Sequence, residues 1–298
     1  MAEYVEIILC TKDGRKYLQD QIESLLSQTY PYICIHVFDD GSRDGTRELL
    51  RHYAAKYPFF HYAQNPTPLG VVKNFERAIA SVEGSLYALC DQDDLWHPRK
   101  IERQVEAIGG EKGPAMVHSD LEMIDERGRV VEPSFFKAKG YAFVDQKAVD
   151  ILISRSGVMG NTILFNKALK RLILPFFSPV PMHDYYIGVI NELFGRRITI
   201  REPLVGYRIH RQNLGNPRRS FLERIRRFFT EPLPYRDREP FLRALLERDD
   251  LEPRDKEVIR EFLECIRRPC LRRRRFYKER PVYRLKLFAR YLLHGPRR

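Results

Sequence analysis

The sequence predicts an α/β fold with a mostly parallel central sheet flanked by helices, plus a C-terminal helical appendage. Short apolar runs alternate three times with stretches of helical periodicity, and three of these runs end in polar turn residues. Such alternation is typical of βαβ units, whose right-handed crossovers bring the carboxyl ends of the strands to one edge. The chain of 298 residues is 43% hydrophobic and 12% aromatic, which excludes a disordered chain.

The expected elements follow one another closely in the first 90 residues. Continuous apolar runs predict buried strands, and apolar residues at spacings of three and four predict helices. We expect strands over residues 5–10, 33–38, 59–63 and 86–90, and helices over 17–26, 46–57 and 71–81.

The rest of the chain has a less regular pattern. Residues 111–216 mix short strands and helices and include the segments 116–120 and 161–165. Residues 217–298 are helical in pattern. We therefore divide the chain into a domain over 1–216, with halves 1–110 and 111–216, and a basic helical region over 217–298.

Three polar clusters, at residues 11–14, 39–42 and 91–94, follow predicted strands. Ligands in open α/β sheets bind outside the carboxyl ends of the strands. Asp91 and Asp93 are two residues apart and point the same way in an extended chain, so they repel each other unless a cation lies between them. This pattern favours a Mg²⁺ or Mn²⁺ site that bridges to a diphosphate. The alternative is a solvated acidic turn.

The order and spacing of five motifs carry a family resemblance. These are Thr-Lys-Asp-Gly at 11–14, Ser-Gln at 27–28, Val-Phe-Asp-Asp-Gly-Ser-Arg-Asp-Gly-Thr at 37–46, Gly70 with Asn74, and Asp-Gln-Asp-Asp at 91–94 with Trp96 and Pro98. Together they resemble the family 2 glycosyltransferases, whose nucleotide-binding fold is called GT-A. The resemblance continues more loosely to about residue 216, through His183-Asp184 and residues 207–213, and is greatest to bacterial rhamnosyltransferase-like members.

The resemblance implies a role for each matching position. The metal ligands would be Asp91, Asp93 and His210. The catalytic base would be Asp184, which could instead cap a helix. The nucleotide-sugar contacts would be Thr11, Asp13, Asp40, Lys73, Asn74, Asp91 and Arg208. The acceptor side would be lined by Trp96, His118, Asp120, Asn161, Thr162 and His183.

Alternatives stay open at several of these positions. Asp40 could serve an Asx turn, Lys73 could be an exposed helix lysine, His210 a surface histidine, and Trp96 a core residue. The family often has asparagine at the position of Asp13.

The implied activity is metal-dependent inverting transfer from dTDP-rhamnose or a UDP-sugar to a glycan acceptor, in cell-surface polysaccharide or cell-wall synthesis. One rival is a sugar-phosphate nucleotidyltransferase, which would need a Gly-rich phosphate loop after the first strand. Another is a nucleic-acid-binding protein that uses the basic tail, which would need aromatic stacking platforms beside the charge.

Positive charge is concentrated at the C-terminal end. Residues 217–298 hold 25 Lys and Arg against 13 Asp and Glu, which accounts for the whole net charge of +12. Such a tail favours contact with an anionic membrane surface and a lipid-linked glycan acceptor. The alternative is a helical appendage that aids formation of a homodimer. We expect a cytoplasmic enzyme, peripheral on the inner face of the plasma membrane.

The termini and the cysteines add little. Residues 1–10 lack the basic start of a secretory signal, and no apolar run reaches the length of a membrane span. Cys10, Cys34 and Cys90 lie in apolar runs and are predicted to be buried and inert. Cys265 and Cys270 do not have a metal-binding spacing.

Overall fold

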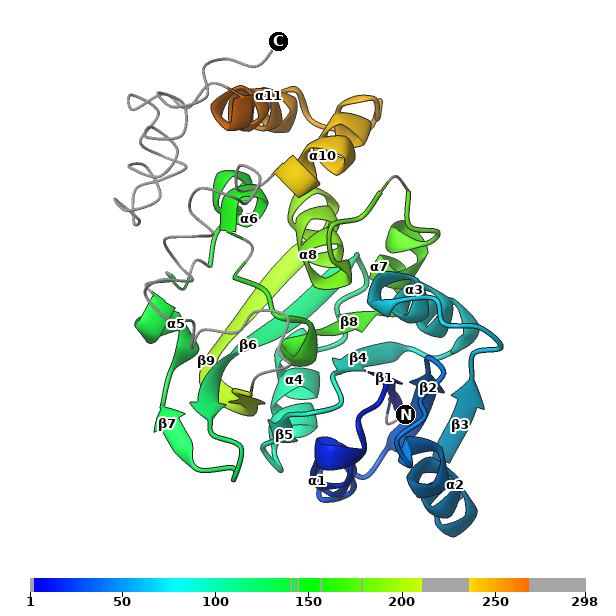
Figure 1. Cartoon of the computed structure of the whole chain (residues 1–298). Coiled ribbons are helices and arrows are strands. Elements are labelled where there is room, and N and C mark those ends of the chain that lie inside the picture. Colours follow the sequence, from blue (N-terminus) through cyan, green and yellow to red (C-terminus); the bar gives the residue numbers. More distant parts are fainter. Residues whose placement is uncertain are drawn as a thin grey trace, which may run out of the picture.

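The computed structural model describes residues 3–139, 141, 143, 145–155, 157–177, 179–210 and 236–267. A nine-stranded sheet crosses this part of the molecule, with helices on both faces (Figure 1). Its strand order is β3-β2-β1-β4-β8-β6-β9-β5, and β7 pairs with β6 beside this path. The predicted α/β fold class is confirmed.

The strands are β1 (Val5–Thr11), β2 (Ile33–Asp39), β3 (Phe60–Gln64), β4 (Leu86–Cys90), β5 (Leu95–Trp96), β6 (Ala115–Ile124), β7 (Val130–Glu132), β8 (Leu164–Asn166) and β9 (Arg196–Arg208). The helices are α1 (Arg15–Leu26), α2 (Thr46–Lys56), α3 (Val71–Ser81), α4 (Lys100–Ile108), α5 (Phe135–Lys139), α6 (Val149–Arg155), α7 (Lys167–Ile173), α8 (His183–Phe194), α10 (Glu239–Leu246) and α11 (Pro253–Arg267). Two 3-10 helices are η1 (Gly160–Thr162) and η2 (Arg236–Arg238).

The first half of the sheet is parallel. β1 pairs with β2 and β4, and β2 pairs with β3, all in parallel register. Helices α1, α2 and α3 connect these four strands in turn, so the carboxyl ends of β1, β2 and β4 lie at the same edge. The predicted elements of residues 1–90 agree with the structure to within two residues at each end.

The second half of the sheet is mixed. β8 lies antiparallel between β4 and β6, whereas β6 and β9 run parallel and β5 pairs antiparallel with β9. The segment 161–165 is divided between η1 and β8. β9 is 13 residues long, so this half also contains an element longer than the short strands that the sequence predicts.

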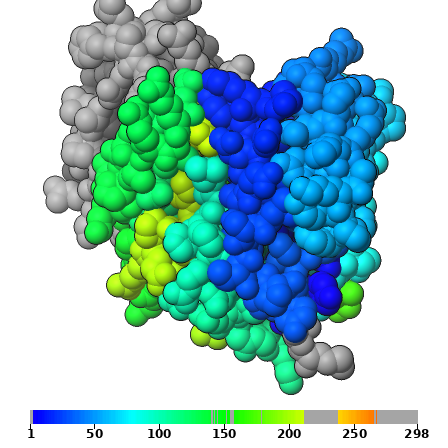
Figure 2. Space-filling model, turned by 90° about the horizontal axis from the view of Figure 1, so that it is seen from below, coloured from blue at the N-terminus to red at the C-terminus, as the bar shows by residue number. Residues whose placement is uncertain are grey.

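The sheet separates two apolar cores. Alternate residues of β1 face opposite sides: Ile8 and Cys10 belong to the core under α3 and α8, and Ile7 and Leu9 to the core under α1, α2 and α4. A parallel strand covered on both faces is continuously apolar for this reason. Figure 2 shows the face where α1, in dark blue, lies between the lighter-blue α2 and the blue-green chain around α4.

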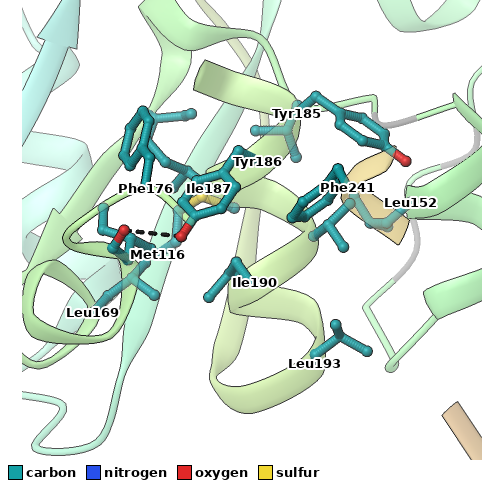
Figure 3. Packing of buried hydrophobic residues seen from close by; sticks show 14 of the residues in the cluster. Met116, Leu152, Leu169, Phe176, Tyr185, Tyr186, Ile187, Ile190, Leu193 and Phe241 are labelled. Atoms are coloured by element: carbon teal, nitrogen blue, oxygen red, sulfur yellow. Dashed lines mark hydrogen bonds between the residues drawn. The ribbon is translucent and has the colours of Figure 1, made fainter. Parts of the chain in front are cut away.

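The C-terminal helices share the first of these cores. Phe241 of α10 is fully buried with residues of α6 and α8 (Figure 3). Phe262 of α11 is fully buried in the same core. Figure 1 shows α10 and α11 next to α6 and α8. The ring of Phe241 lies 5.3 Å from that of Tyr186, whose hydroxyl donates to the carbonyl of Ile173 at 2.9 Å. Within 217–298, the described residues 236–267 are helical and pack on α6 and α8.

Two of the predicted buried thiols, Cys10 and Cys90, are buried. Cys34 is only partly buried, so the predicted burial is wrong for this residue. None of the helices in the described part of the chain combines the length and the apolar composition that crossing a membrane requires.

Candidate active site

The segment after β4 is held in place by Asp94. This carboxylate is fully buried and accepts hydrogen bonds from the backbone N–H of Arg208, at 3.0 Å, and from the Asn161 side-chain amide. Burial, together with Asp93 and Asp91, raises the pKa of Asp94 well above its usual range. Asp94 therefore joins the segment after β4 to the end of β9 and to η1. These three parts of the fold are far apart in the sequence.

Asp93 lies against the end of β9. Its Oδ2 is 2.8 Å from Nε2 of His210, and its carbonyl accepts a hydrogen bond from Nε of Arg208 at 2.9 Å. The His210 ring packs on Tyr17 of α1, with ring centroids 4.9 Å apart. His210 is mostly buried, so the alternative of a surface histidine is excluded.

Asp91, which follows β4, interacts electrostatically with Asp184 in the first turn of α8. Burial, then Asp93 and then Asp184, raises the pKa of Asp91 to about 7. Burial raises the pKa of Asp184 to about 6, while hydrogen bonds from the backbone of Tyr185 and Gly160 and the charge of Arg238 oppose this rise. Three carboxylates thus share one partly enclosed region, as expected for a cation site or for proton transfer.

The loop after β1 is linked to the loops after β4 and β2. The Thr11 hydroxyl donates to Oε1 of Gln92 at 2.7 Å, and the Lys12 N–H donates to the same oxygen at 2.8 Å. The Asp13 carboxylate accepts from the N–H of Arg43 at 2.8 Å. Thr11 and Asp13 therefore lie at the strand ends, where the sequence predicts them.

Asp40 holds the loop that precedes α3. Its Oδ1 accepts from the Asn65 side chain and from the N–H of Leu69, both at 2.7 Å, and its Oδ2 accepts from the N–H of Gly70 at 2.9 Å. Burial would raise the pKa of Asp40, but these hydrogen bonds outweigh burial and lower it. Asn74 joins the same network through the Asn65 side chain and the carbonyl of Phe38.

His183, Asn161 and Thr162 lie beside Asp184 and are all buried. The His183 ring stacks on Phe75 with centroids 3.8 Å apart, and burial lowers its pKa to about 3. Thr162 donates through its hydroxyl to the carbonyl of Met159 at 2.7 Å. These side chains fix the junction of η1 with α8.

Two residues expected on the acceptor side have structural partners instead. His118 is buried on β6 with Nε2 3.0 Å from the Thr199 hydroxyl, and Asp120 accepts from the N–H groups of Leu121 and Phe136. These enclosed positions do not suit acceptor contacts.

Trp96 is in the core, with Lys100 Nζ 3.4 Å from its ring centroid, so the core alternative holds. Arg208 is also buried. Besides bonding to Asp93, its guanidinium donates to the carbonyl of Glu126 at 3.0 Å and to Asp20 at 3.3 Å. Arg208 therefore connects loops of the protein rather than facing a phosphate.

Lys73 is exposed and its Nζ lies 2.6 Å from Oε2 of Glu76 within α3, in agreement with the alternative of an exposed helix lysine. Residues 211–213, which complete the last motif of the resemblance, lie outside the described residues.

A model of the Glycosyl transferase family 2 matches residues 6–156, about half of the chain, which includes β1 from its second residue onward, β2 to β4 and their polar loops. The chain belongs to this family. The family resemblance seen in the sequence is therefore confirmed. The rhamnosyl specificity within it stays a prediction.

Relatives and solved structures agree with this assignment. The chain is 24% identical over 230 residues to an uncharacterised protein of Mycobacterium bovis, covering 74% of this chain and 64% of the relative. It is 27% identical over 207 residues to an uncharacterised glycosyltransferase of Rickettsia typhi, covering 66% and 63%. The match thus spans less than two thirds of the length of these relatives.

Two solved structures share the fold of this glycosyltransferase. Staphylococcus aureus TarS in complex with UDP-GlcNAc is 17% identical with a TM-score of 0.63, covering 87% of this chain and 71% of that one. A mannosyltransferase from Pyrobaculum calidifontis in complex with GDP-Man and Mn²⁺ is 16% identical with a TM-score of 0.63, covering 99% and 76%. The predicted GT-A fold is confirmed.

The donor groups of this glycosyltransferase fit a hard divalent cation. Asp91 and Asp93 offer carboxylate oxygens, the ligands that Mg²⁺ and Mn²⁺ prefer. The pKa of Asp91 is raised first by burial and then by the charges of Asp93 and Asp184, and a cation would offset both effects. In the described part of the chain, Asp91, Asp93 and His210 are not among the sets of three donors that lie within 4.8 Å of one another. Diphosphate oxygens and water would therefore complete the coordination.

Three further residues build the site, although the sequence assigned no role to them: Gln92, Asn65 and Asp94. Each is a buried or half-buried hydrogen-bonding centre between loops. Gln92 and Asp94 belong to the polar cluster at 91–94, and Asn65 follows a predicted strand. Polar residues at strand ends also occur in many solvated turns, so the pattern does not reveal these links between loops.

Proposed function

We propose that the protein catalyses metal-dependent inverting transfer of a sugar from a nucleotide-sugar donor to a glycan acceptor. The observation that carries this proposal is the approach of Asp91, Asp93 and Asp184 at the carboxyl edge of the sheet. Solved structures of the same fold contain UDP-GlcNAc or GDP-Man with Mn²⁺, which supports a nucleotide-sugar donor.

Asp184 is the proposed general base. Its pKa of about 6 leaves the carboxylate mostly ionised at neutral pH yet basic enough to accept a proton. The acceptor hydroxyl oxygen forms a bond to the anomeric carbon while the bond from that carbon to the phosphate oxygen breaks. The hydroxyl proton passes to Asp184, and the nucleoside diphosphate leaves from the opposite face.

Asp93 with Asp91 and His210 would hold the cation, which would supply positive charge to stabilise the leaving diphosphate. The loops after β1 and β2 would bind the nucleotide. Thr11 and Asp13 are candidates for direct contacts, and Asp40 would act by fixing the loop at 65–70, because its oxygens already accept hydrogen bonds from that loop.

Three aspartate-to-asparagine variants test the assignment. We expect Asp184→Asn and Asp93→Asn each to lower sugar transfer by at least about 10²-fold, because general base and electrostatic contributions are of this size. Asp249→Asn, at an exposed position after α10, should keep full activity. Full turnover by purified Asp184→Asn would refute the base, and undiminished turnover in excess EDTA would refute the metal.

The donor is proposed to be dTDP-rhamnose or a UDP-sugar, and the acceptor a glycan or lipid-linked glycan of the cell surface. A panel of dTDP-, UDP- and GDP-sugars, read by release of the nucleoside diphosphate with and without acceptor sugars, distinguishes them. Turnover with GDP-mannose alone would overturn both donor choices.

We further propose that the basic tail docks the enzyme on an anionic membrane. Residues 268–298 alone hold 12 Lys and Arg against one acidic residue. A chain ending at residue 267 keeps α10 and α11 and removes this charge. It should no longer sediment with vesicles that contain anionic lipid, whereas the full chain should, in a salt-dependent way. Equal sedimentation of both chains would contradict the proposal.

A further inference from the structure

A cluster of three metal-binding side-chain types lies on the first two strands, away from the candidate active site. Ligand atoms of Glu6, Cys34 and His36 all lie within 4.8 Å of one another. Glu6 pairs with Cys34 in the parallel register of β1 and β2. His36 is two residues beyond Cys34, so it points to the same face of the sheet. The strand pairing itself therefore brings a sulfur, a nitrogen and an oxygen donor together.

The cluster is remote from the carboxylates of the active site. Glu6 precedes Thr11 by five residues along β1, and a strand rises about 3.3 Å per residue, which places the two regions roughly 16 Å apart. The cluster is also reachable, since the side chains of Glu6 and His36 are 11% and 20% exposed. Its chemistry is not used in the transfer reaction proposed above.

The surroundings leave room for the three side chains and add a second imidazole. A side chain at Gly84 would collide with Cγ of Glu6, so glycine at this position makes space for the carboxylate. The ring of His36 stacks on that of His61 from β3, with centroids 5.1 Å apart and planes at 29°. Glu6 Oε2 is 2.7 Å from Nε2 of His36.

We infer that Glu6, Cys34 and His36 form a second metal site, specific for zinc-like divalent ions. A thiolate and an imidazole select Zn²⁺ over Mg²⁺ or Mn²⁺, and a Cys-His-carboxylate set is within the range of known zinc ligands. Three protein ligands leave one tetrahedral position, which water or the neighbouring His61 would fill. Bound metal would link β1 to β2 at their amino ends, opposite the sheet edge proposed to bind the nucleotide.

Metal binding would require only small movements of the three ligand side chains. Ligand bonds of about 2.0–2.3 Å in a tetrahedron put donor atoms roughly 3.3–3.8 Å apart, against a present upper limit of 4.8 Å. The hydrogen bond between Glu6 and His36 would be replaced by two bonds to the metal. Burial, and then the nearby Glu6, raises the pKa of Cys34 to about 11, so the metal would displace the thiol proton as it binds.

Cobalt titration of the full chain, free of any affinity tag and reduced with a phosphine, tests the inference. Co²⁺ bound to a thiolate gives a sulfur-to-metal charge-transfer absorption that carboxylate sites do not produce. We expect this band to saturate at one equivalent, to disappear on adding one equivalent of Zn²⁺, and to be absent in Cys34→Ser. Glu6→Gln and His36→Asn should each weaken Co²⁺ binding by at least about 10-fold.

Two controls separate this site from the rest of the molecule. His52→Asn changes an exposed histidine of α2 and should leave the band unchanged, as should Asp93→Asn in the active site. A band of full strength in folded Cys34→Ser, or no band in the wild-type protein at millimolar Co²⁺, would overturn the inference. Should Cys34→Ser fail to fold, the other two cluster variants decide, because they keep every cysteine: unchanged affinity in both also overturns it.

Discussion

Asp13 adopts a left-handed backbone conformation with φ of 48°, which is costly for most side chains. Its N–H donates to Oγ of Ser42 at 2.8 Å, and its carboxylate accepts from the N–H of Arg43. Asparagine, common at this position in the family, tolerates the same conformation and offers the same acceptor oxygen. The difference between the two residues therefore leaves the shape of this loop intact.

His118 shows how a buried polar residue sets a pH response. Burial, and then the charge of Arg197, lowers its pKa from 6.5 to about 3, so the folded protein keeps it neutral. Between these values the unfolded chain binds the proton and the folded chain does not, so stability falls as pH falls from about 6.5 towards 3. At pH 5 this residue alone should cost about 2 kcal/mol, at 1.36 kcal/mol per pH unit.

We therefore predict that His118→Gln reduces the loss of stability between pH 8 and pH 5 by about 2 kcal/mol, measured by urea unfolding at each pH. The comparison uses the difference between pH values, because the substitution also changes packing at both. His52→Asn, on the exposed face of α2, should keep the wild-type pH dependence. Parallel stability curves for His118→Gln and the wild type would contradict the assignment.

At the scale of elements, the regular half of the sheet is predictable and the mixed half is not. β1, β2, α3 and β4 have local signals, either an unbroken apolar run or helical spacing, and their positions follow from these alone. β9 begins with exposed charged residues such as Arg196 and Arg201, and β6, a partner remote in the sequence, holds it in the sheet. Such pairing has no local signature.

The candidate site divides in the same way. The sequence predicts that Asp91, Asp93 and Asp40 meet, because parallel topology collects strand ends at one edge. It does not predict that Arg208 and Asp94 serve as buried links between loops. A charged side chain in a motif is equally consistent with a contact to a ligand. Burial distinguishes the two, and burial depends on the tertiary structure.

The junction of η1 with α8 offers a test at this scale. A Cβ at Gly160 would lie 2.8 Å from Nε2 of His183 and 3.6 Å from Cβ of Asp184. His183 cannot swing aside easily, because it is buried and stacked on Phe75. Gly160→Ala should therefore displace the start of α8 and lower sugar transfer about 10²-fold, as expected for a displacement of the base by about 1 Å.

The matched control is Gly188→Ala in the middle of α8, where the nearest atom to a new Cβ is Val158 Cβ at 3.4 Å, an ordinary contact. This variant should retain activity and stability within about 1 kcal/mol. Initial rates and thermal melting of both variants check the prediction. Equal activity of Gly160→Ala and Gly188→Ala would show that the junction does not position the base.

At the scale of the whole molecule, the C-terminal helices affect the stability of the transferase body. Phe241 is fully buried between α8 and the residues of α6 and lies within 6 Å of the rings of Tyr185, Tyr186 and Phe177. α10 and α11 therefore complete the core beneath the helix that carries Asp184. A chain cut before α10 would expose this core, so the described appendage and the body should unfold together.

We predict that Phe241→Ala lowers the free energy of unfolding of the entire described fold by about 3–5 kcal/mol, the usual cost of truncating a buried phenylalanine. The melting temperature should fall by on the order of 10 °C, in one transition that near-ultraviolet circular dichroism and loss of transferase activity follow together. Phe59→Ala, at a position 37% exposed, should change stability by less than about 1 kcal/mol. Two separate transitions, with activity surviving the first, would instead mean that α10 and α11 fold as an independent unit and that the shared core contributes little to the body.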